Sequence, residues 1–519
     1  MKAKSLAIWA IAAVTIPVAY VIYLYSPMLA GRLGLIDDHE FISFLQVGGQ
    51  SFAAIPQMLA ITEIATLGES ARFRPASVLF RALGTVIHGT DGFQWYLVRV
   101  SLVALVVAAF AGLAFIIATQ LKWKPWIAGV FAVVIGLLLA GMKSWSDIAT
   151  RLGPSELFLM VGLAIAAWGT WHLFNKRQVL LSGLATGLGF AMAVGSKENA
   201  LSLLLPLLLV LVLLSRQGVK LPGLLIAGSL SLVATVYTAL GFLPTVLNSG
   251  QDVYGQSRSV TGALVAAAQL WPFWTSLLIA AYVLYRVLSG KERGLKSWLQ
   301  IGLGFMPVLM VSSEAFFYQY SIIGGSFTHA RYGVVTEFIG LLTIATLVLL
   351  ASTHKTPKGA MLRNVALGAA ALAVLGPLGQ LSSSTEYRNS SRANAEYLNA
   401  QFSALESTAQ NLKTQNIDQV LYLVDEPYDY ERINASRQYI AYLSGETKDF
   451  FLWTDFTGVQ YDQFTMPLGE ELSLWSAEGN PAWEILPLDD LKQDSPTLCV
   501  HFGKDPVNSP CSQSQWIGG

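Results

Sequence analysis

A series of long apolar segments, separated by short polar loops, runs through most of this chain. A helix needs about 20 apolar residues to cross the hydrocarbon core of a bilayer. Only 13% of the residues are charged, whereas soluble domains carry about 25%. The sequence therefore predicts a polytopic α-helical membrane protein with about eleven membrane-spanning helices. We place these helices at residues 5–29, 95–119, 125–142, 155–174, 179–195, 200–215, 221–247, 262–289, 298–317, 332–351 and 364–382.

The positive charges of the short loops indicate how the helices are oriented. Every second loop holds at least two lysines or arginines, as at Lys122 and Lys124, whereas the loops between them mostly hold one, such as Lys197. Because Lys and Arg are enriched in cytoplasmic loops, this alternation predicts a cytoplasmic N-terminus and an extracytoplasmic C-terminal segment. We expect a multi-pass protein of the bacterial inner membrane. The net charge of zero does not indicate a nucleic-acid partner.

The composition changes near residue 383, which divides the chain into two predicted regions. Residues 1–382 form a transmembrane module, and residues 383–519 are polar and mixed. In the second region helical spacing alternates with β-branched and aromatic runs, which is typical of a small α/β domain. The helical segments are 394–412 and 437–443, and the strand-like runs are 420–424, 450–453 and 497–502. Cys499 and Cys511 could form a disulfide if this end of the chain faces an oxidising compartment.

Residues 30–94 form the first extracytoplasmic loop, which is too long to be a simple turn. Apolar runs at 41–45, 52–55 and 76–83 are too short to span a bilayer. We expect the first two to form helices that lie in the plane of the membrane interface.

Asp37 and Asp38 follow the first predicted span and stand next to the membrane surface, beside His39 and Glu40. Charge at a membrane edge is costly unless it is solvated or paired, so such a cluster indicates a functional site. The structural alternative is that Asp37 caps a short helix that starts near His39. One aspartate could serve both purposes.

Lys197 and Glu198 lie in the short turn between two predicted spans, where no charge is required. They could form a solvated pair whose lysine snorkels to the interface. Alternatively, Lys197 binds an anion in a cavity that opens outward.

Arginines reach the same outer face at two further places. Arg72 and Arg74 lie in the first loop, and Arg331 precedes the tenth predicted span. These arginines could contact lipid head groups, or they could bind phosphate through two parallel hydrogen bonds. We expect His329 to be a structural or interfacial histidine, and Glu314 lies among aromatic residues typical of a membrane-interface belt.

Acids in one outer loop and cations in others suit the transfer of a group from a phosphate-activated donor in the membrane. Asp37 or Asp38 would act as general base on an acceptor hydroxyl, and cations would stabilise the departing phosphate. We expect no metal or other cofactor; a divalent metal, if one binds, would be held by Asp37 and Asp38. The predicted donor phosphate-binding residues are Lys197, Arg74, Arg331 and Arg72, and the possible substrate contacts are Glu198, His329, Glu314 and Glu40.

These features together resemble the GT-C superfamily of integral-membrane glycosyltransferases, in particular protein O-mannosyltransferase-like and aminoarabinose transferase-like members. The resemblance rests on the acidic pair in the first extracytoplasmic loop, the number of spans and the extracytoplasmic C-terminal domain. The Arg-Phe-Arg-Pro sequence at 72–75 is similar to an Arg-Pro stretch in the first loop of such proteins. The Gly-Ser-Lys-Glu sequence at 195–198 is similar to a Lys-Glu turn between their mid-chain spans.

The resemblance implies inverting transfer of one sugar from a polyprenyl- or dolichyl-phosphate donor to an acceptor hydroxyl, with one aspartate as base. The expected partners are the lipid-linked sugar donor, a glycan, lipid or protein acceptor, and membrane lipid. The chain lacks the Trp-Trp-Asp motif of the oligosaccharyltransferases, which argues against transfer of lipid-linked oligosaccharides to asparagine.

A transporter or flippase of a lipid-linked sugar is the main alternative. Transporters usually carry charged or broken helices near the bilayer midplane and internal repeats. Here the charges gather at the outer rim and no repeat is evident. A ligase that uses a lipid diphosphate donor would carry a large loop between late spans, but the loop at 318–331 is short.

Overall fold

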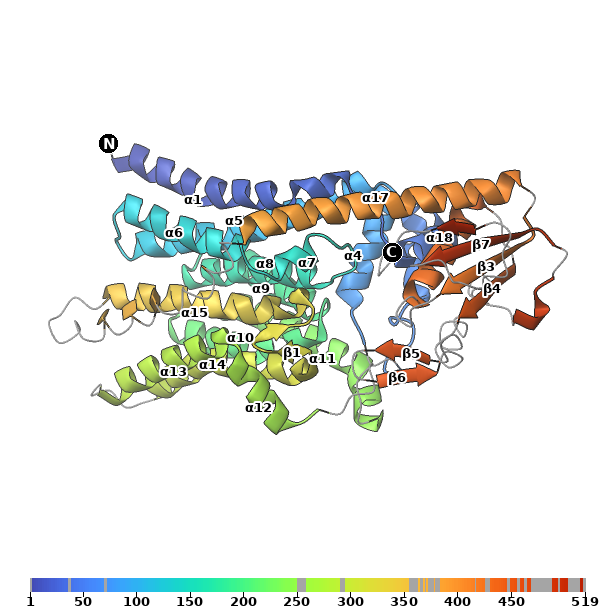
Figure 1. Ribbon diagram of the computed structural model, residues 1–519. Coiled ribbons are helices and arrows are strands. Elements are labelled where there is room, and N and C mark those ends of the chain that lie inside the picture. The colour runs from blue at the N-terminus through green and yellow to red at the C-terminus, as the bar shows by residue number, and fades with distance from the viewer. Residues whose placement is uncertain are drawn as a thin grey trace.

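A bundle of long helices fills one end of the protein, and a small parallel sheet lies at the other (Figure 1). The N-terminus is at the end of the bundle that is far from the sheet. The computed structural model describes residues 2–35, 39–69, 72–249, 258–289, 295–353, 383–415, 417–424, 430–445, 449–454, 458–461, 464–467, 488–492, 495–502 and 514–516, with scattered residues between 363 and 378.

Within these residues, eight helical segments are long and apolar enough to cross a membrane. They are α1 (Lys2–Tyr25) with η1 (Ser26–Ala30), α5 (Gly92–Gln120), α8 (Glu156–Phe174), η3 (Glu198–Leu203) with α10 (Leu204–Arg216), α11 (Leu221–Ser249), α13 (Trp271–Ser289), α14 (Leu295–Phe317), and η5 (Ala330–Gly333) with α15 (Val334–Thr353). Shorter apolar helices are α6 (Pro125–Ala140), α9 (Val179–Val194) and α12 (Val260–Gln269). The predicted polytopic helical membrane fold is confirmed, and the span expected at 364–382 lies largely outside the described residues.

The segment expected as one span at 262–289 is divided into two helices. Helix α12 ends at Gln269, and the backbone of Leu270 is extended, with φ −91° and ψ 129°. Helix α13 then begins at Trp271, followed by Pro272. A proline has no N–H to donate and clashes with the preceding turn, so it fits the start of a helix and not its interior. The prediction of one continuous helix over 262–289 is therefore wrong.

Helices α8 and α9 pack closely because glycine lies where they meet. A Cβ added at Gly162 would come within 2.5 Å of the Gly189 carbonyl oxygen, so only glycine allows this approach. The two helices are joined by a short turn at 175–178 and therefore run antiparallel. This arrangement places the turn after α9, which carries Lys197, beside the start of α8, which carries Glu156.

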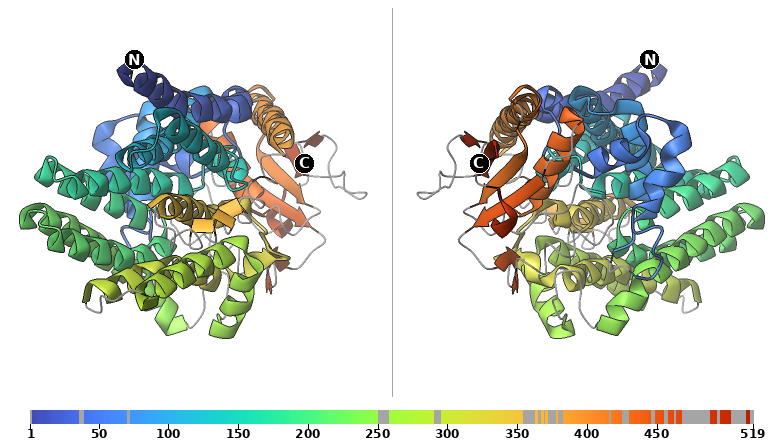
Figure 2. Two further views of the ribbon diagram at one scale, coloured as in Figure 1. Left: turned by 90° about the vertical axis from the view of Figure 1, so that its left-hand side faces the viewer. Right: turned by 90° about the vertical axis from the view of Figure 1, so that its right-hand side faces the viewer.

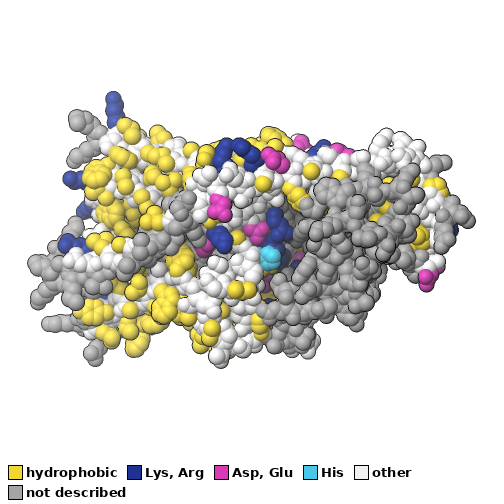
Figure 3. All heavy atoms as spheres, viewed as in Figure 1, with side chains coloured by type: hydrophobic (Ala, Val, Ile, Leu, Met, Phe, Trp, Pro, Cys, Tyr) yellow, Lys and Arg dark blue, Asp and Glu magenta, His cyan; other side chains and the backbone are white. Residues whose placement is uncertain are grey.

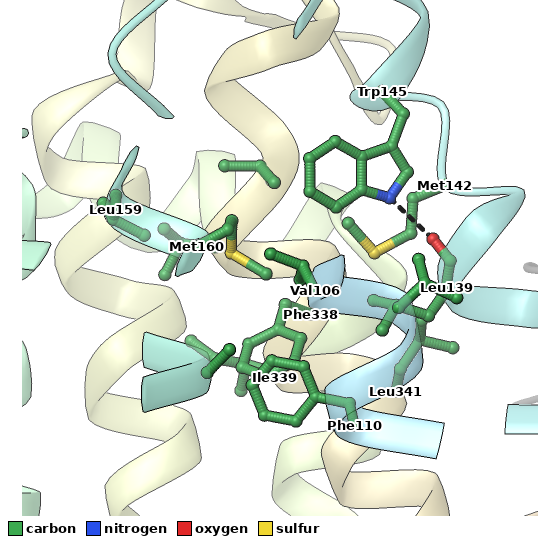
Figure 4. Close-up of a cluster of buried hydrophobic side chains, with 14 of the residues drawn as sticks. Val106, Phe110, Leu139, Met142, Trp145, Leu159, Met160, Phe338, Ile339 and Leu341 are labelled. Carbon is green, nitrogen blue, oxygen red and sulfur yellow. Dashed lines mark hydrogen bonds between the residues drawn. The ribbon is translucent and has the colours of Figure 1, made fainter. Parts of the chain in front are cut away.

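Large apolar side chains fill the bundle core (Figure 4). The rings of Phe110 and Phe338 lie 4.6 Å apart between α5 and α15. Trp145 is fully buried, and its Nε1 donates to the Leu139 carbonyl over 2.7 Å. This bond anchors the short helix α7 (Trp145–Ile148) to the end of α6. The buried tryptophan thus holds in place a helix that carries the charged residue Asp147.

The C-terminal sheet has the strand order β4-β3-β7-β8, and all neighbouring strands are parallel. Alternate residues of the central strand β3 enter two cores, with Val420 and Tyr422 on one face and Leu421 and Leu423 on the other. The predicted helices and strands of this region are confirmed as α17 (Ser384–Thr414), β3 (Gln419–Val424), α18 (Tyr430–Ser444), β4 (Asp449–Thr454) and β7 (Thr497–Phe502). The structure also contains strand β8 (Ser514–Trp516) and a hairpin of β5 (Gly458–Tyr461) and β6 (Phe464–Pro467). Cys499 is disulfide-bonded, and Cys511 lies outside the described residues.

The first loop packs against this C-terminal region. It contains α2 (His39–Gly48), η2 (Phe52–Ala54), α3 (Ile55–Ala60) and α4 (Pro75–His88), so the helix expected near His39 is confirmed. Phe41 and Ile42 of α2 share one buried core with Phe402 of α17 and Tyr439 of α18, so protein covers these side chains. The Tyr439 hydroxyl donates to the Gly34 carbonyl over 3.0 Å. The N-terminal part of α17 lies alongside α1 (Figure 2).

Candidate functional site

Charged side chains gather where the bundle meets the first loop and the C-terminal region. In Figure 3 acidic and basic side chains cluster around a hollow near the middle of the visible face, whereas apolar side chains cover much of the bundle. The charged residues come from the first loop, α7 and the ends of α8, α9, α14 and α15. We define the rim cluster as Arg74, Asp147, Glu156, Lys197, Glu198, Glu314 and Arg331.

The sequence motifs at 72–75 and 195–198 meet in the rim cluster. Arg74 directly precedes α4, and its Nε lies 2.9 Å from Oε1 of Glu198. The Phe73 N–H donates to the same carboxylate over 3.3 Å, and the Ala76 N–H donates to the Gly195 carbonyl over 2.8 Å. Burial acts to lower the pKa of Arg74, but Glu198 beside it holds that pKa above its ordinary value.

Lys197 and Glu156 form a buried ion pair. Nζ of Lys197 lies 2.8 Å from Oε1 of Glu156, and the two side chains are only 6% and 3% exposed. The ammonium group also lies 5.9 and 5.3 Å from the ring centroids of Tyr318 and Tyr332. The interpretation of Lys197 as a solvated, snorkelling lysine is therefore wrong. Burial, together with the charge of Arg74, lowers the pKa of Lys197 to about 8.

The sequence does not single out Glu156 as a site residue, because this glutamate opens an apolar segment and lies within the predicted span at 155–174. Buried Arg99, which also lies within a predicted span, organises the chain just before it by donating to the carbonyls of Ile148, Leu152 and Pro154. A carboxylate in the first turn of a helix, two residues after a proline and at the start of an apolar run, is favoured by the helix dipole. That pattern was the available signal for a buried acid at this end of the bundle.

Glu314 is fully buried near the C-terminal end of α14. Its Oε2 accepts a hydrogen bond from Nδ2 of Asn199 over 2.5 Å. The interpretation of Glu314 as part of a lipid-facing aromatic belt is therefore wrong, because protein covers the side chain. The ring of Tyr318, one turn further on, stacks on Tyr332 with centroids 4.6 Å apart. His329 is exposed and packs edge-on against the Tyr332 ring.

Arg331 and Arg151 share the carboxylate of Asp147 on α7. Their Nη1 atoms lie 4.0 and 3.6 Å from Oδ1 of Asp147, and the Arg331 N–H donates to Oδ2 over 3.3 Å. Three predicted phosphate-binding cations, Arg74, Lys197 and Arg331, thus each have a carboxylate partner. The rim cluster is a set of neutralised pairs and not a patch of uncompensated positive charge.

The predicted catalytic pair, Asp37 and Asp38, lies outside the described residues, but the chain on both sides of it is described. On the C-terminal side, Glu40 pairs with Arg81 of α4, and Nη2 of Arg81 donates to the Gly153 carbonyl over 2.6 Å. Gly153 lies just before the start of α8. The chain next to the aspartates is therefore tied to the edge of the rim cluster.

The structure brings most of the predicted site residues together. The rim cluster contains Lys197, Arg74, Arg331, Glu198 and Glu314, all predicted from the sequence. Arg72 is partly buried next to the Arg74 segment, Glu40 lies at the edge of the cluster and His329 lies on its exposed side. No group of three His, Cys, Asp or Glu side chains in the described part of the chain is arranged to hold a metal ion.

Comparison of the chain with family models and with curated proteins finds no match. The chemistry of the rim cluster and its place in the fold are therefore the guides to function.

Proposed function

We propose that this chain is a GT-C-like glycosyltransferase that moves a sugar from a polyprenyl-phosphate donor to an acceptor hydroxyl on the extracytoplasmic face, with inversion. The observation that carries the proposal is the convergence of Arg74, Lys197 and Arg331 in a buried cluster at one end of an apolar bundle. Buried charge at a membrane edge is costly, so its presence suggests a function. Cations in this place suit a phosphate group whose lipid chain lies in the surrounding bilayer.

In the proposed reaction the acceptor oxygen attacks the anomeric carbon of the donor sugar. Asp37 or Asp38 takes the hydroxyl proton as the new carbon–oxygen bond forms. The bond between the anomeric carbon and the phosphate oxygen breaks, and its electron pair stays on the phosphate. Lys197 and Arg74 stabilise the charge that develops there, so no general acid is required.

Donor binding must change the pairing within the rim cluster, because its cations already have carboxylate partners. The Arg74 Nε–H is shared between the two oxygens of Glu198, at 2.9 and 3.1 Å. A phosphate also offers acceptor oxygens and can take the place of that carboxylate beside the guanidinium. Exchange of one anion for another is therefore the expected first step of donor binding.

Two observations and the predicted eleventh span support an extracytoplasmic site. The exposed loops with Lys122, Lys124, Lys176 and Arg177 lie between the helix ends opposite to the rim cluster, as expected for cytoplasmic loops. An eleventh span at 364–382 would bring the C-terminal region to the rim side of the membrane. The disulfide at Cys499 fits an oxidising compartment, such as the outer side of a bacterial inner membrane.

The positions of the charges favour an enzyme over a transporter. In the eight candidate spans, every Asp, Glu, Lys and Arg lies outside the middle third of its segment. Transporters commonly place binding groups near the bilayer midplane, often on broken helices. The rim cluster instead lies at the helix ends, where an acceptor from outside the cell can reach it.

Incubation of the purified protein in lipid nanodiscs with a panel of polyprenyl-phosphate sugars and candidate acceptors tests the proposal. Mass spectrometry should detect glycosylated acceptor and free polyprenyl phosphate in equal amounts. A matching panel of polyprenyl diphosphate sugars serves as control and should not react. If no donor supports transfer but intact donor moves across proteoliposome membranes, the protein is a flippase and not a glycosyltransferase.

A further inference from the structure

A small pocket lies beside the rim cluster and takes no part in the phosphate binding or proton transfer described above. Its volume is about 150 Å³, and it lies between the N-terminal ends of α13 and α15, next to the hairpin of β1 (Ile322–Ile323) and β2 (Ser326–Phe327). Ala330 in its wall directly precedes Arg331, and Lys143 in its wall lies just before α7. The pocket therefore adjoins the charges that would hold the donor phosphate.

The lining of the pocket combines aromatic rings with polar groups. Trp271 and Phe327 contribute rings, Thr336 a hydroxyl and Glu337 a carboxylate. The Trp271 ring is wedged against α15, because a Cβ added at Gly340 would come within 2.5 Å of it. A rigid aromatic wall with a few convergent polar groups is typical of a small-molecule site.

Thr336 gives an independent indication of a polar ligand. Its side chain is 1% exposed, and its hydroxyl has no hydrogen-bond partner in the part of the chain that the structure describes. Thr343 and Thr346 in the same helix each donate to the carbonyl four residues earlier, over 2.8 and 2.7 Å. Buried hydroxyls in native proteins nearly always have a partner. The partner of Thr336 is therefore expected to come from whatever occupies the pocket.

We propose that this pocket binds the sugar ring of the lipid-phosphate donor. A monosaccharide has apolar C–H faces that pack on aromatic rings, and hydroxyls that both donate to Glu337 and accept from Thr336. A volume of about 150 Å³ has room for one small ring. This inference rests on the proposed function, to which it adds a site that holds one sugar ring and forms hydrogen bonds with its hydroxyls.

The test compares two lipids that differ only in the sugar. Thr336→Val removes the hydroxyl and keeps the shape of the side chain, and Thr343→Val is the matched control on the same helix. Binding of polyprenyl phosphate and of a panel of polyprenyl-phosphate monosaccharides is measured in nanodiscs for the wild type and both variants. Thr336→Val should weaken binding of the preferred sugar lipid about tenfold and leave polyprenyl phosphate unchanged. Thr343→Val should change neither affinity.

A second variant, Ala330→Leu, narrows the pocket and should weaken the sugar lipid without weakening polyprenyl phosphate. If the wild type prefers a sugar lipid but Thr336→Val and Ala330→Leu retain that preference, the pocket is not the sugar site, although the proposed function stands. If the wild type binds both lipids equally, the pocket assignment fails and the proposed function stands. If the wild type binds neither lipid, the proposed function and the pocket assignment fail together.

Discussion

Cations lie at both ends of the helical bundle, but in opposite environments. At the end near the N-terminus, Lys122, Lys124 and Lys176 are exposed in tight turns, two of them at positive φ (62° for Lys122 and 56° for Lys176). At the other end, Lys197 is buried with Glu156, and Arg74 is partly buried with Glu198. Water solvates the first group and carboxylates neutralise the second.

The difference separates two uses of positive charge in a membrane protein. Exposed lysines cost little to keep in place and serve to orient the spans. A buried lysine must recover its lost hydration from a partner, and replacing such a pair by apolar residues is often neutral or stabilising. Stability alone therefore gives a poor reason for the rim cluster, and binding of a charged ligand gives a better one.

Loss of the predicted base should have the largest effect. Asp37→Asn or Asp38→Asn should lower kcat for sugar transfer by about 10²- to 10⁴-fold, because a general base contributes an effect of that size. The donor Kd should change little in either variant. Exposed Asp489 supplies a control, Asp489→Asn, with unchanged kcat. If both single variants and the double variant keep the wild-type kcat, neither aspartate is the general base.

The second-largest effect is expected on the free energy of unfolding, when a buried ion pair at the rim end of the bundle is broken. Glu156→Gln leaves the Lys197 ammonium buried without its partner and should lower the free energy of unfolding by about 3 kcal/mol. The double variant Glu156→Gln with Lys197→Met should recover most of that loss. Denaturant titration in a mild detergent measures both. A Glu156→Gln protein as stable as the wild type would show that the ion pair is not buried.

Donor affinity should fall as the pH rises through about 8, where Lys197 loses its proton. Its pKa is lowered from 10.5, so the ammonium that would hold phosphate is present below about pH 8 and absent above it. Between those two values the unfolded chain binds the proton more readily, so this group makes folding more favourable as the pH rises. Titration of polyprenyl phosphate binding checks the effect, and Lys197→Arg should flatten the curve because arginine keeps its charge. An equally flat curve for the wild type would contradict the role of Lys197.

The smallest effect is expected at the exposed end. Lys122→Gln with Lys124→Gln should leave sugar transfer unchanged and alter the free energy of unfolding by no more than about 0.5 kcal/mol. Transfer kinetics and denaturant titration provide the measurement. A marked loss of transfer in this variant would mean that exposed and buried cations do not differ in function.

The elements of the fold were largely predictable from the sequence, because each depends on a local pattern. Long apolar runs predicted helices such as α5 and α14, and the β-branched run at 420–424 predicted the buried strand β3. The break at Leu270 was missed because the apolar composition continues across it, although Pro272 was a visible signal. Composition indicates where helices can form, and backbone chemistry decides where they stop.

The pairing within the candidate site was less predictable. Arg74 and Glu198 were both identified, but 124 positions separate them along the chain, and no local pattern indicates that they meet. Charge next to an apolar run does not distinguish a solvated lysine from a buried one, as Lys197 shows. Glu156 was overlooked because the start of an apolar segment was taken as part of the span. Each of these assignments depends on how the helices pack, which a single sequence does not record.

Phosphate binding by the buried cations is the central claim, and equilibrium binding of radiolabelled polyprenyl phosphate tests it most directly. The wild type and the variant with Lys122→Gln and Lys124→Gln should bind the lipid saturably and with equal affinity. The variant with Glu156→Gln and Lys197→Met, which has no unpaired buried charge at this pair, should bind it at least about tenfold more weakly. Equal affinity in all three proteins, or no saturable binding by the wild type, would contradict the account.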